Sequence, residues 1–365
     1  MSRKVKAEHG IVCRLPGEPF GYFGWPSVAR MDDGTLVVSS SGLRTEHVCP
    51  FGKTVLNFSG DSGRTWSAPH VVNDSPLDDR DAGVVSLGGK AMLVSWFTSD
   101  TRRYFDQAKQ SLSAESIARW ERAFSTWTDQ TLNRWLGSWA LLLEGDAPRG
   151  GPIRVPVSAP HGPVRLAGGD LLYLGKAGFG AGDQQSGDVV ACRSSDGGRT
   201  WLELGHVPIH DGTQPDHYHE PHVAELADGR LIGMIRFEGR GEDDPAGDFH
   251  FHLFQTASDD GGRTWTRARP TGVYGSPPHL LRHSSGALVC AYGYRRPPFG
   301  QRVMISTDAG ESWQSDWILR DDGPDGDLGY PASVEMPDGS VLTVYYQKYR
   351  AGEKCSLLWS RWSLP

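Results

Sequence analysis

Three ionisable residues occupy one shared position in a strand pattern that recurs along the 365-residue sequence. The pattern reads x-P-x-x-x-x-[LM]-x-[DG]-G-x-[LV], and in its clear and looser copies the first position is held by Trp25, Asp81, Pro160, Glu220, Pro277 and Tyr330. Two carboxyls and a phenol can exchange protons or attack carbon. Each alone could be a packing or solvated residue, but packing does not require three ionisable groups in one register. We therefore expect Asp81, Glu220 and Tyr330 to converge on one pocket.

A second repeat marks the turns that must hold these strands in place. The octapeptide S-x-D-x-G-x-[ST]-W occurs at residues 59–66, 194–201, 258–265 and 306–313. Its Asp and its hydroxyl residues can bond the backbone of a tight turn, its Gly supplies a positive φ, and its Trp can pack under the next strand. The octapeptide is therefore predicted to be a β-hairpin turn and not a catalytic site.

The two repeats together predict the fold. The strand pattern occurs six times, and the octapeptides follow units one, three, four and five. Repeats of this kind are typical of blades that contain four antiparallel strands. We expect an all-β, six-bladed β-propeller that spans residues 1–365 as one domain, with residues 5–14 as a strand that completes the last sheet.

One segment interrupts the strand patterns. Between residues 101 and 144, apolar residues from Ile117 to Leu142 recur at steps of three and four, which predicts an amphipathic helical insertion in blade two. In such a blade the connection from strand two to strand three lies on the face where strand one begins, whereas the octapeptide turns lie on the opposite face. The insertion should therefore project from the face of the pocket, help to shape it, and offer a surface on which a second copy could pack.

The octapeptide is the Asp-box, and the chain resembles the sialidase (neuraminidase) superfamily of β-propellers that carry it. In that superfamily a Tyr is the nucleophile, a Glu is its base, and an Asp acts first as acid and then as base. Residues 329–339, GYPASVEMPDG, are similar to the nucleophile strand, and residues 219–236 look like the strand pair that carries the Glu. The resemblance implies Tyr330 as nucleophile, Glu220 as its base and Asp81 as acid/base.

The chemistry of an acidic sugar explains this choice of groups. The anomeric carbon of a sialoside carries a carboxylate, so an anionic Asp or Glu nucleophile would be repelled by it. A neutral Tyr hydroxyl that loses its proton to Glu during the attack avoids this repulsion. Asp81 must be protonated to assist the leaving group, and partial desolvation would favour that state by raising its pKa.

The carboxylate clamp that the resemblance implies is only partly present. Sialidases use three Arg residues, the first in an R-I-P triplet of blade one, but the matching stretch here reads FGWP. Arg236 fits the second Arg, and Arg295 or Arg296 fits the third. Arg44, which we expect on a loop of blade one at the face of the pocket, or Lys176 could replace the first. The predicted substrate-binding residues are Trp25, Arg44, His161, Lys176, His219, Arg236, Arg295 and Arg296.

Composition narrows the other functions. The formal net charge is −7, so we expect no nucleic-acid partner. The sequence has no apolar run long enough to cross a membrane, and its first residues lack the apolar core of a signal peptide. We expect a cytoplasmic protein that binds carbohydrate and could form homo-oligomers; secretion with a removed signal stays open.

Cysteine and histidine usage gives no clear metal signal. The five cysteines are scattered and lack zinc spacing, which favours buried reduced thiols. His217, His219 and His222 crowd the strand of Glu220, so a metal site is one alternative, and hydrogen bonds to sugar hydroxyls are the other. We favour the sugar contacts and expect no cofactor.

We therefore predict a retaining exo-glycosidase that acts on a terminal acidic sugar. Two alternatives stay open. In a polysaccharide lyase, Tyr330 or a histidine would remove the proton α to a uronate carboxylate while Arg236 neutralises the anion, and an unsaturated uronate would appear. A sugar-binding propeller without catalysis would bind and turn nothing over.

Overall fold

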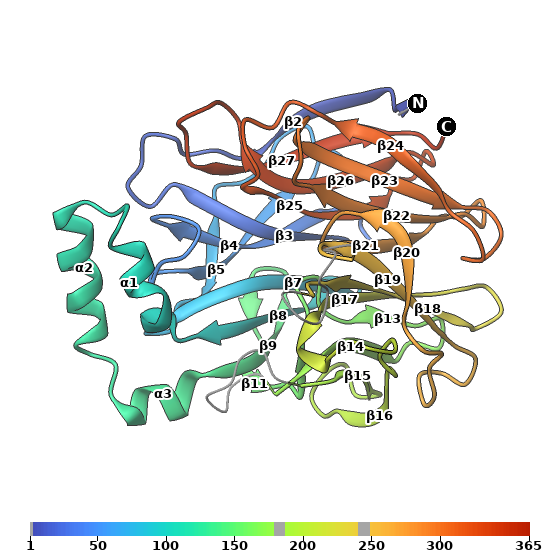
Figure 1. Cartoon of the computed structure of the whole chain (residues 1–365), viewed down its shortest axis with the longest axis horizontal. Helices are drawn as coiled ribbons and strands as arrows, with labels where there is room; N and C mark the ends of the chain where they lie inside the picture. The colour runs from blue at the N-terminus through green and yellow to red at the C-terminus, as the bar shows by residue number, and fades with distance from the viewer. Residues whose placement is uncertain (1–2, 179–186, 240–248) are drawn as a thin grey trace.

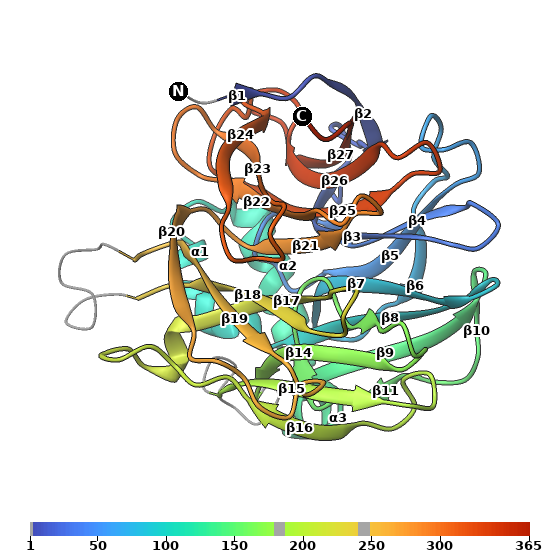
Figure 2. The same ribbon diagram turned by 90° about the vertical axis from the view of Figure 1, so that its right-hand side faces the viewer.

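The computed structural model describes residues 3–178, 187–239 and 249–365, and its strands form six sheets around a common axis (Figure 1). In Figure 2 the labelled first strands of the sheets lie toward the centre and the last strands lie toward the rim. Inner strands of neighbouring sheets contact one another. The predicted six-bladed β-propeller is confirmed. None of the helices in these three segments is long and apolar enough to span a membrane.

Each blade is built mainly from consecutive antiparallel strands. Blade one contains β3 (Tyr22–Arg30), β4 (Leu36–Arg44), β5 (Lys53–Ser59) and β6 (His70–Asn73). Blade two contains β7 (Asp78–Gly88), β8 (Ala91–Ser99), β9 (Gly137–Glu144), β10 (Ala147–Pro148) and β11 (Ile153–Arg154). Blade three contains β12 (Val157–Ser158), β13 (Val164–Arg165), β14 (Leu171–Ala177), β15 (Val189–Ser194) and β16 (Leu202–His206).

The other three blades follow the same plan. Blade four contains β17 (Tyr218–Glu225), β18 (Leu231–Phe237), β19 (His252–Ser258) and β20 (Arg269–Tyr274), and the 3-10 helix η2 (Pro215–His217) precedes it. Blade five contains β21 (Pro278–Arg282), β22 (Leu288–Tyr294), β23 (Gly300–Ser306), β24 (Gln314–Arg320) and β1 (Arg3–Lys4). Blade six contains β25 (Leu328–Glu335), β26 (Val341–Lys348), β27 (Cys355–Trp362) and β2 (Ala7–Cys13).

The ring is closed by pairing the two ends of the chain. Strand β2 is antiparallel to β27 and forms the outer strand of blade six, as predicted for residues 5–14. Strand β1 pairs in parallel with β24 of blade five, which the sequence did not indicate. Both ends of the chain consequently lie close together in Figure 1.

The four octapeptides form the predicted turns. In the blade-four copy, Ser258 Oγ accepts a bond from the Gly262 amide at 2.9 Å, and Asp260 accepts bonds from the Thr264 amide at 2.9 Å and the Thr264 hydroxyl at 2.7 Å. Trp265 donates from Nε1 to the Gly262 carbonyl at 3.0 Å. The other copies repeat the serine and aspartate bonds. The turns join β5 to β6, β15 to β16, β19 to β20 and β23 to β24, which are the third and fourth strands of their blades if β12 and β13 count as one divided first strand.

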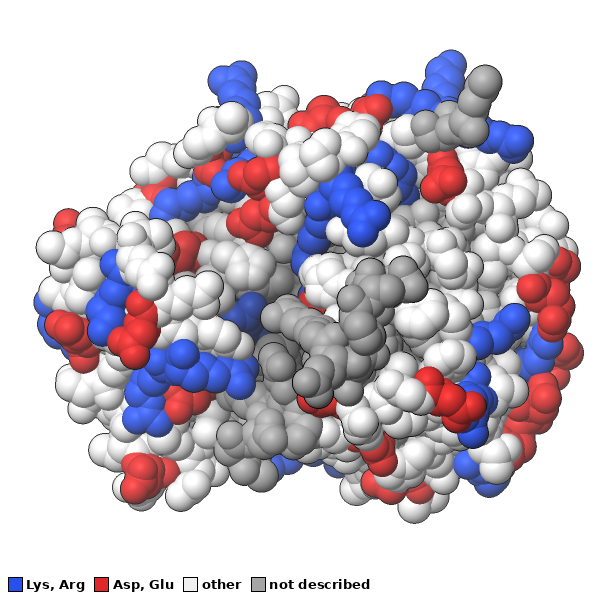
Figure 3. Space-filling model, in the orientation of Figure 1, with Lys and Arg blue, Asp and Glu red and all other residues white. Residues whose placement is uncertain are grey.

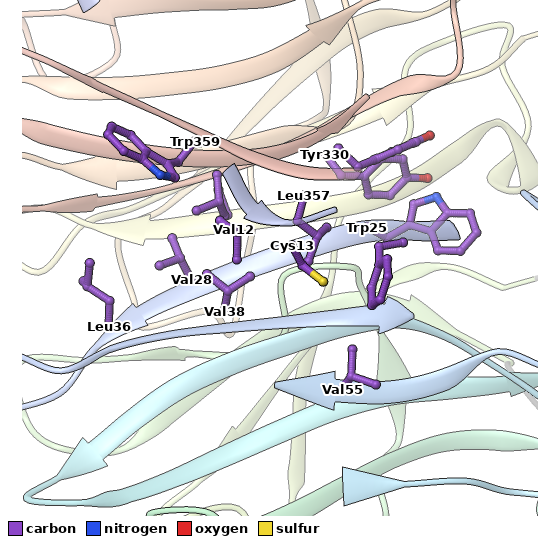
Figure 4. Close-up of a cluster of buried hydrophobic side chains, with 14 of the residues drawn as sticks. Val12, Cys13, Trp25, Val28, Leu36, Val38, Val55, Tyr330, Leu357 and Trp359 are labelled. Carbon is purple, nitrogen blue, oxygen red and sulfur yellow. The ribbon is translucent and has the colours of Figure 1, made fainter. Parts of the chain in front are cut away.

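Hydrophobic clusters fill the spaces between neighbouring blades. The cluster between blades six and one includes Val28, Leu36 and Trp359, and Trp25 and Tyr330 belong to it as well. Figure 4 shows the rings of Trp25 and Tyr330 side by side at one end of this cluster. Trp25 and Tyr330, both predicted to lie in the pocket, are therefore packed against apolar side chains, and this packing restricts their rotamers.

The helical insertion leaves blade two between β8 and β9, as predicted. It contains η1 (Thr101–Tyr104), α1 (Phe105–Ala108), α2 (Ala114–Phe124) and α3 (Asp129–Trp135). Ser113 and Thr128 cap α2 and α3 by accepting bonds from backbone amides three residues on. Figure 1 shows the helices together at one end of the blades.

The packing of the insertion corrects one predicted boundary. Trp120 is fully buried, and its ring stacks on Phe105 with centroids 5.7 Å apart. The helices end at Trp135, however, and the segment up to residue 144 is strand β9 and not helix. Trp139 and Leu142 lie three residues apart, a spacing that fits a helix, but the fully apolar stretch between them is a buried central strand.

We expect Asp260→Asn to destabilise the protein near neutral pH but hardly in strong acid. The bonds from the Thr264 amide and hydroxyl lower the pKa of Asp260 to about 2. Because the folded pKa lies below the unfolded value, this stabilisation is present above about pH 4 and is lost as the pH falls toward about 2. Melting temperatures measured across this range should show the gap between wild type and variant closing.

The control is Asp259→Asn, which changes the exposed neighbouring carboxyl and leaves the bonds of Asp260 in place. It should behave as wild type at every pH. A gap between wild type and Asp260→Asn that is constant with pH would contradict the assignment of the stabilisation to the ionised carboxylate.

Candidate active site

Four of the six shared strand positions lie on the same kind of β-bulge. Trp25, Asp81, Glu220 and Tyr330 have φ angles of 54°, 49°, 49° and 51°. At each one the strand gains a residue over its partner. In blade six, for example, the three steps from Gly329 to Ala332 are matched by two steps on β26. A bulge turns its side chain in a new direction, and a positive φ outside glycine is strained. The other two positions are prolines, whose ring excludes a positive φ.

The bulged side chains open onto a cavity of about 370 Å³. It lies at the beginning of the first strands, on the face opposite the octapeptide turns. The three residues predicted to be catalytic, Asp81, Glu220 and Tyr330, all line it. The charged residues of its wall are the cations Arg80, Arg103, Lys176, Arg236 and Arg295 and the acids Asp81, Glu220 and Glu238. The cations outnumber the acids, so the cavity favours an anionic ligand.

Tyr330 and Glu220 are hydrogen-bonded, as the sequence analysis predicts. The Tyr330 hydroxyl donates a short bond to Glu220 Oε1. Arg236 Nη1 donates to Glu220 Oε2 at 2.6 Å and lies 3.3 Å from the Tyr330 hydroxyl, while its Nη2 donates to Glu238. Arg236 is 8% exposed. It therefore fixes both members of the Tyr330–Glu220 pair.

The electrostatic surroundings keep the Tyr330 phenol protonated until a base accepts its proton. Burial raises the pKa of Tyr330 well above its ordinary value, and the charges of Glu220 and Asp81 raise it further. Arg236 and Arg295 act in the opposite direction. A neutral phenol that donates to a carboxylate, beside two guanidinium groups, is the arrangement that a phenolate nucleophile needs.

Asp81 is buried beside this pair and has an unusual acidity. Burial is the largest cause that raises the pKa of Asp81, and the charge of Glu220 is the second; together they bring it to about 7. Arg80, Arg44 and Arg236 oppose the shift. A substantial share of the Asp81 carboxyl groups is therefore protonated at neutral pH, as a general acid requires.

Arg80 and Arg295 supply the accessible positive charge. The Arg80 guanidinium lies over the ring of Trp25, with Cζ 4.4 Å from the centroid. Arg295 donates from Nε to the Leu328 carbonyl at 3.1 Å. Among the described residues, the nearest carboxylate oxygen to Arg80 is 3.7 Å away on Asp78, and Arg295 has no ion pair. Both can therefore bind a carboxylate from a ligand.

Two of the predicted cations lie outside the cavity. Arg44 is fully buried in β4, where it donates to both oxygens of Asp78 at 2.6 and 3.0 Å. The prediction placed Arg44 on a loop, but β4 continues to it, so its side chain is enclosed by the blade. Arg296 lies over Tyr274 at 3.7 Å from the ring centroid and not in the cavity wall.

Lys176 lines the cavity, but its ammonium group is already bound to the protein. Its Nζ donates to the carbonyls of Pro215, Asp216 and Tyr218 at 3.4, 3.3 and 2.9 Å. Three carbonyl acceptors match the three protons of an ammonium group. Lys176 therefore holds η2 against blade three and is a poor replacement for the missing Arg of the clamp.

The two predicted histidines are found in different places. His219 lines the cavity, and burial, then Lys176 and Arg236, lower its pKa to about 3, so its ring is neutral. His161 lies outside the wall, with Nδ1 2.9 Å from the Ser27 hydroxyl and its ring beside His222 and His279. In the three described segments, no group of His, Cys, Asp or Glu residues could hold a metal ion.

Arg80 is the functional candidate that sequence reasoning missed. In a regular strand, adjacent residues point to opposite faces, so the residue before Asp81 should point away from the pocket. The bulge at Asp81 breaks this alternation, and Arg80 and Asp81 both line the cavity. His219 and Glu220 form a second adjacent pair with the same property. The Arg80-Asp81 dipeptide would have predicted a cation beside the acid if a bulge had been assumed at Asp81.

The insertion also borders the cavity. Arg103 and Tyr104 of η1, at its very start, are in the wall together with Phe97 and Ser99 of β8. Figure 3 shows basic side chains on the insertion and on the blades beside the hollow that separates them. The prediction that the insertion helps to shape the pocket therefore agrees with the geometry of its first turn.

No family model matches the chain, and no curated protein matches it. Among solved structures it is similar to a protein of unknown function from Dyadobacter fermentans, with a TM-score of 0.76, 21% identity and 99% of both chains covered. It is also similar to the sialidase of Trypanosoma rangeli, with a TM-score of 0.63 and 14% identity. The match covers 97% of this chain but only 59% of that sialidase.

A third similar structure is the intramolecular trans-sialidase of Ruminococcus gnavus, solved with oseltamivir carboxylate. Its TM-score is 0.63 at 14% identity, and 97% of each chain is covered. At these identities the similarity is one of fold. The chain has a β-propeller whose structural relatives include sialidases.

The Asp81 carboxyl should titrate near neutral pH, and Glu220→Gln should lower its pKa. The neutral amide removes the like charge that helps to hold the proton on Asp81. Nuclear magnetic resonance of protein carrying isotopically labelled aspartate measures this directly, and loss of the signal in Asp81→Asn assigns it.

Asp79 is the internal control. Burial, with the charge of Asp78, raises its pKa to about 7 as well, but Glu220 is not among the causes. In Glu220→Gln the Asp79 titration should stay where it is. Equal shifts for both groups, or none for Asp81, would show that Glu220 and Asp81 do not interact closely.

Proposed function

We propose that the chain is a retaining exo-glycosidase of the sialidase type that removes a terminal acidic sugar. The hydrogen bond from Tyr330 to Glu220, inside a cavity shared with Asp81 and several arginines, carries the proposal. The fold similarity to sialidases supports it. The four octapeptides, with their common hydrogen bonds, fit the Asp-boxes of that superfamily.

The first step forms a bond between the sugar and Tyr330. Glu220 takes the phenol proton through the existing hydrogen bond as the Tyr330 oxygen attacks the anomeric carbon. The bond from that carbon to the leaving oxygen breaks, and protonated Asp81 gives its proton to this oxygen. Arg236 lies beside both Glu220 and the phenol oxygen and stabilises the negative charge that develops there.

The second step reverses these roles. Asp81, now a carboxylate, takes a proton from water as the water oxygen attacks the anomeric carbon. The bond to Tyr330 breaks, and the phenolate recovers its proton from Glu220. Two displacements at one carbon leave the configuration of the sugar unchanged. Asp81 alternates between two protonation states, which its pKa of about 7 allows at neutral pH.

The arginines divide the work between nucleophile and substrate. Arg236 is bound to Glu220 and Glu238 and serves mainly to position the nucleophile pair. Arg80 and Arg295 are the candidates to bind the substrate carboxylate. Among the described residues, the one ion pair of Arg80 is long, at 3.7 Å from Asp78, which is already bound to Arg44, and Arg295 has none. Arg80 replaces, from blade two, the Arg that the first blade lacks.

A second candidate is a lyase that acts on a uronate, and the place of His219 in the cavity wall is the observation in its favour. The neutral ring has a nitrogen that can accept a proton α to a carboxylate, but its pKa of about 3 makes it a weak base. The products separate the two reactions, because a lyase leaves an unsaturated, ultraviolet-absorbing uronate and a hydrolase adds water.

Wild-type protein should hydrolyse aryl glycosides of sialic or related acidic sugars, and Tyr330→Phe should lower kcat at least about 100-fold, because the nucleophile is lost. Proton resonance of the fresh product should show the retained anomer. Tyr345→Phe is the matched control, since it removes a buried hydroxyl bonded to Ser360, away from the cavity. Binding of acidic sugars without turnover by the wild type would favour the sugar-binding alternative.

Arg80→Ala should raise KM for an acidic sugar by about 2 kcal/mol, roughly thirtyfold, because a charge-assisted bond to the carboxylate is lost. It should also shift the alkaline limb of the pH profile, where Asp81 loses its proton, to higher pH, because Arg80 lowers the pKa of Asp81. Arg296→Ala, outside the cavity, should change neither quantity. An unchanged KM in Arg80→Ala would argue that the reacting sugar is neutral.

A further inference from the structure

The position of the acid fixes the direction in which a leaving group must extend. A general acid has to lie beside the oxygen that it protonates. Asp81 is on β7, and its neighbour Arg80 is paired in register with Phe97 near the end of β8. Strand β8 ends at Ser99, and η1 follows at once. The atoms beyond the leaving oxygen therefore lie toward the end of β8 and the first turn of the insertion.

The end of β8 and the first turn of the insertion together form this region of the cavity wall. Phe97, Ser99, Arg103 and Tyr104 line the cavity in common with Asp81. The Arg103 guanidinium lies over the ring of Tyr104, with Cζ 4.6 Å from the centroid. A cation stacked on an aromatic ring is restrained, so less entropy is lost when it binds a ligand.

Adjacent arginines of η1 have opposite environments. Arg102 is held by the Asp100 carboxylate through bonds of 3.0, 3.1 and 2.6 Å, and Asp100 also caps η1. Arg103 has no ion pair with any described residue and borders the cavity. The two acids nearest in sequence, Asp100 and Asp106, are paired with Arg102 and Lys109, which leaves the charge of Arg103 for a ligand.

Arg103 is also separate from the cations assigned to the reacting sugar. Arg80 lies on the inner strand β7 and Arg295 directly follows β22 of blade five, whereas Arg103 lies in η1 of the insertion. One or two guanidinium groups are enough to bind one carboxylate. A third available arginine, on the side of the acid, indicates a second anionic group in the substrate.

We infer that Arg103 and Tyr104 form a leaving-group subsite that selects a negatively charged leaving group. The inference rests on the proposed function and extends it to the unit next to the bond that breaks. The substrate is then a terminal acidic sugar joined to a second unit that carries a carboxylate, as in an acidic glycan. Tyr104 offers an aromatic surface for the ring of that unit, and Arg103 binds its anion.

Two matched glycosides test this on the full-length protein. Both carry the same acidic sugar on a phenol, with a carboxylate at the far ring position in one and a neutral carboxamide in the other. Wild type should prefer the carboxylate compound. Arg103→Ala should raise KM for it by about twofold to fivefold, the range for an exposed ion pair, and leave its kcat and the carboxamide compound unchanged.

Controls separate charge from folding. Arg103→Lys should keep most of the preference, and Arg122→Ala, which removes an exposed arginine from α2 of the same insertion, should keep all of it. The preference should shrink at high salt, because exposed charges are screened. Melting temperatures of the variants should match that of wild type.

The two glycosides also separate a failure of the proposed function from a failure of the leaving-group subsite. If wild type turns over neither glycoside, the proposed function is wrong and this inference falls with it. If it turns over both equally well, or if Arg103→Ala slows both to the same extent, the reaction is as proposed but the anionic subsite does not exist.

Discussion

One extra residue in each of four inner strands gives the site its geometry. At Trp25, Asp81, Glu220 and Tyr330 the backbone adopts a φ near 50° within a bulge, a conformation that costs on the order of 1–3 kcal/mol at each position. The strain persists because the clusters between blades and the flanking strand pairs hold the bulge on both sides. In return, side chains that would otherwise alternate between faces all turn toward the axis. The prolines at the other two positions leave blades three and five without such a side chain, so the site is asymmetric although the fold is nearly regular.

Electrostatic competition within the cavity follows from this convergence. One oxygen of Glu220 accepts a hydrogen bond from the Tyr330 phenol and the other accepts one from Arg236. Burial and, second, the charge of Glu220 raise the pKa of Asp81 to about 7. The charge of the proposed base therefore raises the pKa of the proposed acid, although the two residues come from different blades. Arg236 is occupied by two carboxylates, so the binding of a substrate anion depends on cations that enter from other elements.

The sequence was informative wherever a repeat could be counted. Six strand patterns predicted six blades, the octapeptides predicted their own turns, and the shared register brought Asp81, Glu220 and Tyr330 together. The misses have physical reasons. Two-residue alternation hides a bulge, so Arg80 was overlooked, and the lengths of β4 and β9 depend on partner strands, so Arg44 was placed on a loop and residues 137–144 in a helix. Lys176 could not be judged without seeing the three carbonyls that surround its ammonium group.

The pairing of β2 with β27, which closes the ring, has a consequence for folding during synthesis on the ribosome. Strand β2 emerges early but must wait, unpaired, until β27 has been made. Tyr330 and Glu220 are 110 residues apart and meet only when blade six takes its place beside blade one. A nascent chain that contains only the first five blades therefore has Asp81 and Glu220 but lacks Tyr330. Under the proposed mechanism, the nucleophile and its base come together only with the sixth blade, so a chain interrupted before it would be inert.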